Sequence, residues 1–163
     1  MRVIQGDDCF KITLDKVITK RLEQCVMKEN GSGPVMLYLK DSEVICLETG
    51  FATLYLIDKK IILVEVRKGA LINRKLVKHH LNLLERLIDK NYSIVDNRKN
   101  DFTHDIVEIF EELHSRVRLK KVAVVTYRNQ TNLISEIESQ LCQKDFAVFG
   151  DVESAIRWAK EIP

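Results

Sequence analysis

The chain lacks most of the motifs that identify an activity. It has four cysteines that are widely spaced, form no CxxC pair and have no histidine at zinc-finger spacing: Cys9, Cys25, Cys46 and Cys142. We therefore predict no metal site. No apolar run approaches the roughly 20 residues that cross a bilayer. Asp7 and Asp8 interrupt the N-terminal apolar stretch early, so no signal peptide is predicted. We expect a cytoplasmic protein with reduced thiols and no membrane insertion.

An excess of charge of one sign is also missing. The 26 basic and 24 acidic residues are interleaved and give a formal charge of +2, which argues against nucleic acid as a partner. Apolar residues make up 45% and charged residues 31% of the 163 residues, as in folded globular domains. The sequence has no internal repeat, so we expect one domain with an appendage.

The N-terminal third predicts a helix followed by strands. Apolar residues recur at helical spacing over about 14–28, behind the capping candidate Thr13. A stretch containing two glycines, a serine and a proline follows, up to Pro34. Short runs rich in β-branched and aromatic residues then predict three or four antiparallel strands: 34–39, 43–48, 51–57 and 60–66. The breaks between them include a predicted turn at Asp58-Lys59.

Strand and helix alternate from Gly69 to the end. We predict helices with an apolar stripe over about 76–88 (capped by Asn73), 103–117 (beginning at Thr103), 131–141 and 152–159 (capped by Asp151). The strands between them are expected at 93–95, 122–126 and 146–149. Strands joined through helices run parallel. The predicted fold class is therefore α/β, with a mixed sheet of antiparallel hairpin strands followed by parallel βα units, covered by helices.

The run from Gly50 to Ile106, followed by KKVAVVTYRNQTNLISEIES and KDFAVFGDVESAIRWAKE, resembles SpoIIAA-like domains, which are relatives of the STAS fold. Such domains open with a hairpin, continue through a helix to a strand ending in aspartate, and often end on a similar phenylalanine, alanine and tryptophan pattern. The resemblance covers about residues 50–163. It divides the chain into an N-terminal extension (1–49) and a SpoIIAA-like domain.

The resemblance implies a regulatory or ligand-binding function. Anti-sigma factor antagonists of the STAS group carry an Asp-Ser-Ser-Gly stretch whose serine is phosphorylated. The matching stretch here runs from Asp96 to Asp105 and contains neither that tetrad nor a serine. Thr103 is its one hydroxyl residue, which makes Thr103 the candidate for phosphorylation.

Two polar segments are candidate ligand sites. Asp96, Arg98, Lys99 and Thr103 follow a predicted parallel strand and lead toward a helix, at the sheet edge where ligands of open α/β sheets gather. The alternative for this segment is a solvated turn whose Thr103 caps the helix.

Tyr127 and Arg128 follow the central predicted strand at the same edge. Tyr127 would cover an apolar ligand and Arg128 would hold an anionic end. The alternative is again an ordinary polar loop.

No catalytic residue or cofactor is predicted. His79 and His80 point about 100° apart on one helix and cannot chelate a metal together; they are interpreted as core or surface residues. His104 and His114 are isolated in the sequence, and no nucleophile–histidine pair is indicated by spacing.

Three functions stay open. The favoured one is a non-enzymatic regulatory or binding module that takes a small ligand or a protein partner. The second is an enzyme of unrecognised type that uses the polar loops at Asp96 and Arg128. The third is a structural protein whose helix at 14–28 docks on another chain or forms a homodimer.

Overall fold

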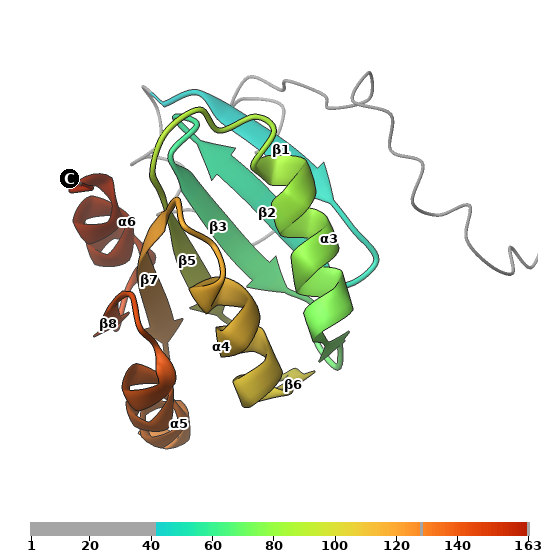
Figure 1. Ribbon diagram of the computed structural model, residues 1–163. Helices are drawn as coiled ribbons and strands as arrows, with labels where there is room; N and C mark the ends of the chain where they lie inside the picture. Colours follow the sequence, from blue (N-terminus) through green and yellow to red (C-terminus); the bar gives the residue numbers. More distant parts are fainter. Residues whose placement is uncertain (1–41, 128, 163) are drawn as a thin grey trace, which may run out of the picture.

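The computed structural model describes residues 42–127 and 129–162, and for residues 129–133 the backbone alone (Figure 1). Within these residues the main element is a six-stranded sheet in the order β1-β2-β3-β5-β7-β8. Its strands are β1 (Val44–Glu48), β2 (Ala52–Ile57), β3 (Ile61–Val66), β5 (Tyr92–Arg98), β7 (Leu119–Thr126) and β8 (Asp145–Phe149). The helices are α3 (Arg74–Leu84), α4 (Ile106–His114), α5 (Asn129–Leu141) and α6 (Val152–Lys160). Two short strands, β4 (Leu71–Ile72) and β6 (Thr103–His104), pair in parallel beside them.

The first three strands form an antiparallel meander. β1 pairs with β2, and β2 pairs with β3 from Ala52–Val66 to Ile57–Ile61. Asp58 and Lys59 make the predicted turn, both with φ of 51°, a left-handed conformation that aspartate adopts in tight hairpins. β1 belongs to this sheet although it precedes residue 50, the predicted start of the domain. The domain boundary stays a prediction.

The rest of the sheet is parallel. β3 pairs with β5, β5 with β7 and β7 with β8 in parallel, and α3, α4 and α5 make the connections between them. Parallel neighbours need such crossovers because a short loop cannot return the chain to the start of the sheet. The predicted fold class, a mixed sheet with antiparallel strands followed by parallel βα units, is therefore confirmed.

Helices cover both faces of the sheet (Figure 1). Buried residues of α3 and α4 pack with one face of β2, β3, β5 and β7. The opposite face packs against α6 through Val152, Ala155, Ile156 and Ala159. Alternate residues of a strand point to opposite faces, so each central strand contributes to both cores. Asp151 caps α6 as predicted, because its carboxylate accepts the Ser154 N–H at 2.7 Å.

The prediction that a helix begins at Thr103 is wrong. The Thr103 N–H donates to the Ala70 carbonyl at 2.9 Å, which places this residue in the extended strand β6. The helix begins three residues later at Ile106, and the Asp105 carboxylate caps it by accepting the Glu108 N–H at 3.0 Å. Pairing with β4 therefore decides the backbone conformation here, and the aspartate takes the capping position.

The predicted inward stripe of α5 is also wrong. Ile134, Ile137 and Leu141 are 40%, 55% and 39% exposed, whereas Ser135 and Glu138 are fully buried. The helix lies over β7 and β8 at the edge of the sheet, where one of its flanks faces solvent. Glu138 turns inward because two buried cationic or donor side chains bind its carboxylate, as described below. The helix α3 ends at Leu84 rather than near 88, although Ile88 is still buried.

The predicted helix at 14–28 and the predicted strand at 34–39 lie outside the described residues. Among the described residues, no helix has the length and apolar character needed to span a membrane.

Candidate functional site

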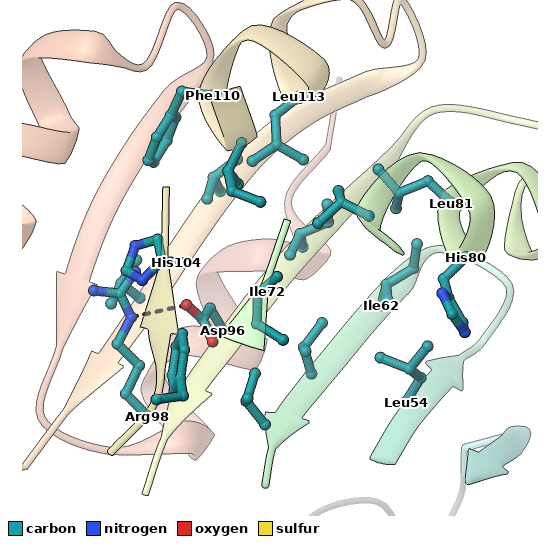
Figure 2. Close-up of a pocket in the computed structure, with 18 of the residues that line it drawn as sticks. Leu54, Ile62, Ile72, His80, Leu81, Asp96, Arg98, His104, Phe110 and Leu113 are labelled. Carbon is teal, nitrogen blue, oxygen red and sulfur yellow. Dashed lines mark hydrogen bonds and ion pairs between the residues drawn. The ribbon is translucent and has the colours of Figure 1, made fainter. Parts of the chain in front are cut away.

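A pocket of about 120 Å³ lies between the sheet and helices α3 and α4 (Figure 2). Most of its wall is aliphatic or aromatic. The lining residues come from β2, β3, β5 and β7, from the three helices on this face and from the β4–β6 pair; among them are Leu54, Ile62, Val64, Ile72, Leu81, Ile94, Phe102, Ile109, Phe110, Leu113, Val122 and Val124. A concave apolar wall with few polar groups is typical of sites for small ligands.

Charged side chains gather at one end of this pocket. Figure 2 shows Asp96, Arg98 and His104 together there, whereas His80 lies at the opposite end beside Leu54 and Leu81. The Arg98 guanidinium donates through Nε to Asp96 Oδ2 at 2.8 Å and through Nη2 to Glu138 Oε1 at 2.8 Å. His104 Nε2 lies 3.1 Å from the same Glu138 oxygen. We call these four residues the charged cluster.

Two members of the charged cluster, Asp96 and Arg98, lie on the same face of β5 because alternate residues of a strand point to the same side. Ile94, Asp96 and Arg98 all line the pocket, while the residues between them face α6. β5 continues through Arg98 because each residue from Ser93 onward pairs with β7, ending with Arg98 opposite Thr126. The strand is therefore longer than the predicted 93–95, and it fixes the direction of both charged side chains.

The other two members come from separate elements. His104 ends β6, whose pairing with β4 also holds Phe102 and Ile72 at the pocket wall. Glu138 projects from the buried side of α5 and is 0% exposed. Three elements, β5, β6 and α5, thus bring the charged cluster together across 42 positions of sequence, from Asp96 to Glu138. Asp96 and Arg98 are the one bonded pair whose members are close in the sequence.

Hydrogen bonds keep Glu138 and Arg98 ionised despite their burial. Burial acts to raise the pKa of Glu138, but hydrogen bonds from His104 and Arg98 and the charge of Arg98 outweigh it and lower this pKa below its ordinary value. Burial acts to lower the pKa of Arg98, but the Asp96 and Glu138 carboxylates raise it above the ordinary arginine value. One guanidinium is therefore shared between two carboxyl groups.

Among the described residues, one oxygen of each of these carboxyl groups has no partner. Glu138 Oε2 and Asp96 Oδ1 are buried and accept no hydrogen bond from the described residues. Leaving a buried acceptor unpaired typically costs about 1–3 kcal/mol, and more for a charged group. Both residues line the pocket, and both of these oxygen atoms are buried from solvent.

His80 has a different environment at the apolar end. Its ring meets that of Phe51 edge to face at 4.8 Å between centroids, and its Nδ1 lies 2.8 Å from the Leu76 carbonyl. Burial lowers the pKa of His80, and the charge of His79 adds to this, although the bond to Leu76 opposes both.

Among the described residues, no group of three or more histidine, cysteine or acidic side chains is arranged to hold a metal ion.

The structure divides the predicted ligand-binding residues between the two faces of the sheet. Asp96 and Arg98 lie in the pocket. Lys99 and Tyr127 interact on the other face: Lys99 Nζ lies 2.7 Å from Glu65 Oε1, and the Tyr127 hydroxyl donates to Asn97 Oδ1 at 2.9 Å. The two partners also bind each other, because Asn97 Nδ2 donates to Glu65 Oε1 at 2.6 Å.

Thr103, the candidate for phosphorylation, is exposed on β6 between two pocket residues. Arg128 lies outside the described residues. The structure therefore brings together two of the six predicted residues, and it adds two that the sequence analysis did not single out, Glu138 and His104. The sequence LISEIESQL contains two acidic residues, Glu136 and Glu138. Acidic side chains enter a core when they are paired, but nothing in the sequence distinguishes Glu138 from Glu136.

Comparisons with known proteins give one likeness, at the level of fold. The chain is similar to an uncharacterised protein of the DUF3478 family with a SpoIIAA-like fold from Shewanella loihica PV-4, at 10% sequence identity and a TM-score of 0.44, over 72% of this chain and 93% of that one. The fold printed for that protein is the one that this sequence resembles. No family model and no curated protein matches the chain.

Proposed function

We propose that this domain is a non-enzymatic binding module that holds a small, mostly apolar ligand in the pocket. One observation carries the proposal: an apolar cavity of about 120 Å³ ends at a largely buried charged cluster, in which two carboxylate oxygens have no partner among the described residues. Protein interiors are ordinarily close-packed, and voids larger than a water molecule are few. A cavity of this size lowers stability, which supports a role in binding rather than in packing.

The size of the pocket limits the ligand. An apolar protein cavity of roughly 150 Å³ holds one benzene molecule. The pocket here, at about 120 Å³, therefore suits a body of about six non-hydrogen atoms. Such a ligand is much smaller than those held in typical drug-sized sites of about 300–1,000 Å³.

A titration of the ¹⁵N-labelled 163-residue chain with benzene tests this proposal by NMR. We expect saturable shifts of amide signals in β3, β5 and α4, the elements that line the pocket. Val124 is 1% exposed and lines the pocket, so Val124→Phe should fill the space and abolish the shifts. Val148 is 42% exposed at the edge strand, and Val148→Phe is the matched control that should bind benzene as the unmodified chain does.

The proposal fails if benzene gives no saturable shifts in the unmodified chain. It also fails if Val124→Phe, once its spectrum shows that it is folded, binds benzene with unchanged affinity. In that case the binding site lies elsewhere in the chain.

A further inference from the structure

The charged cluster also indicates the chemical class of the ligand's polar end. Glu138 is 0% exposed, yet its Oε2 atom has no hydrogen-bond donor among the described residues. Asp96 Oδ1 is in the same state. Buried polar atoms in folded proteins nearly always have a partner. Two acceptors at the same end of one pocket therefore match a ligand that donates hydrogen bonds.

The nearby donors are already engaged. Arg98 is 8% exposed in its side chain and binds both Asp96 and Glu138. Among the described residues, Lys99 is a further cation near the end of β5, and it pairs with Glu65 on the opposite face of the sheet. With one guanidinium shared by two carboxyl groups, the formal charges of Asp96, Glu138 and Arg98 sum to −1. An anionic ligand would be repelled there, whereas a cation would compensate this charge.

The charged end of the pocket is less completely buried than its apolar end. The side chains of Asp96 and His104 are 20% and 15% exposed, while the apolar residues Leu54, Ile62 and Leu81 are almost fully buried. A ligand would thus place its apolar body inside and its charged head at the accessible end, which avoids the cost of burying an unpaired charge.

We propose that the ligand is a small amine whose ammonium group donates hydrogen bonds to Asp96 and Glu138 and whose apolar body fills the pocket. This inference rests on the proposed function, because it assigns the head group of a ligand in that same pocket. It differs from the prediction of an anionic end near Arg128, a residue that lies outside the described structure.

A matched series of five-carbon compounds tests the head group. The 163-residue chain is titrated with n-pentylamine, 1-pentanol and pentanoate at pH 7 and constant ionic strength, with binding followed by NMR or calorimetry. We expect n-pentylamine to bind about tenfold or more tighter than 1-pentanol, because hydrogen bonds to charged groups are the stronger ones. Pentanoate should bind most weakly.

Two substitutions place the effect at the charged cluster. Asp96→Asn removes one carboxylate from the pocket and should weaken n-pentylamine binding about tenfold, with 1-pentanol binding changed much less. Glu65→Gln is the matched control: Glu65 lies on an adjacent strand, but its carboxylate binds Asn97 and Lys99 on the α6 side. This control should leave the binding of all three compounds unchanged.

The outcomes separate the two proposals. If pentanoate or 1-pentanol binds as tightly as n-pentylamine, the amine inference is overturned while the binding module stands. If none of the three compounds binds and benzene does not bind either, the proposed function itself fails. The ranking in the unmodified chain decides the question even if Asp96→Asn does not fold.

Discussion

The two faces of the sheet are built from the same strands but packed in opposite ways. On the α6 face the core is mostly apolar, and its buried polar side chains have partners: the Ser93 hydroxyl donates to the Ala159 carbonyl, and the Lys121 ammonium donates to the Trp158 carbonyl. The same core contains the fully buried Ala155 and Ala159 of the helix and Ala123 of β7. On the α3–α4 face the same strands leave a cavity of about 120 Å³ and carry the charged cluster. Small residues allow α6 to approach the sheet closely, whereas larger side chains hold α3 and α4 away from it.

This difference separates stability from function within one domain. A closed apolar face contributes burial at roughly 25 cal/mol per Å² and needs no polar partners. The α3–α4 face loses part of this stabilisation at its cavity. It also buries ionised groups, which is costly unless they are paired. Proteins retain such unfavourable features mainly where they bind or react. The predictions below test whether the two faces differ as described.

The largest expected effect concerns the charged cluster. Glu138→Ala leaves Arg98 and His104 without their shared acceptor inside the core, and removing one partner of a buried ion pair typically costs about 3–5 kcal/mol. We expect a loss of that size in the free energy of unfolding, measured by urea denaturation. Glu136→Ala, on the exposed side of the same helix, is the control and should change stability by less than about 0.5 kcal/mol.

Equal losses in the two variants would contradict the orientation of α5 and restore the apolar stripe that its sequence predicts. They would also mean that the charged cluster is not buried, and the contrast between the faces would disappear.

The second prediction adds volume to each face. Ala155→Leu forces extra atoms into the closed α6 face, where overpacking typically costs about 1–3 kcal/mol. Val124→Ile adds one methylene next to the pocket and should be neutral or stabilise the fold by up to about 0.8 kcal/mol, the contribution of one buried CH₂ group. Thermal and urea unfolding of both variants measure the difference. A comparable loss in both would show that the two faces are equally packed.

Much of the fold follows from the sequence, because local patterns decide it. The continuous apolar run VAVVT predicts the central strand, and the caps at Asn73 and Asp151 are where the side-chain pattern places them. The start of α4 was misplaced because β6 pairs with β4, a contact between residues about 30 positions apart. The helix and strand propensities of single residues depend on the local sequence and cannot reveal a pairing over this distance.

The candidate site is harder to predict for the same reason. The sequence predicts Asp96 and Arg98 because they follow an apolar strand. Glu138 stands 40 residues after Arg98, on a helix whose apolar residues favour the opposite orientation. The tertiary ion pair outweighs the hydrophobic stripe because an unpaired buried guanidinium would cost more than exposing two isoleucines. Residues 1–41 and Arg128 lie outside the described structure, so the predicted docking helix stays a prediction.

The smallest expected effect is a pH dependence confined to the pocket face. Because the pKa of His80 is lowered in the folded state, mainly by burial, the unfolded chain binds a proton below about pH 6.5 that the folded chain does not. The free energy of unfolding should therefore fall as the pH drops through about 6.5, until His80 also protonates in the folded state. His80→Leu removes this contribution, so the stability of the unmodified chain relative to the variant should decline from pH 7 to pH 5.

Urea unfolding at several pH values between 5 and 7 measures this decline, with His114→Gln at the exposed end of α4 as the control for losing a histidine. Benzene should steepen the slope, since a ligand that fills the apolar end of the pocket keeps His80 dehydrated and neutral. A stability difference that stays constant with pH would mean that water reaches His80 freely. The pocket would then be an open cleft rather than an enclosed site. The two faces would differ only in how deeply their surfaces are hollowed.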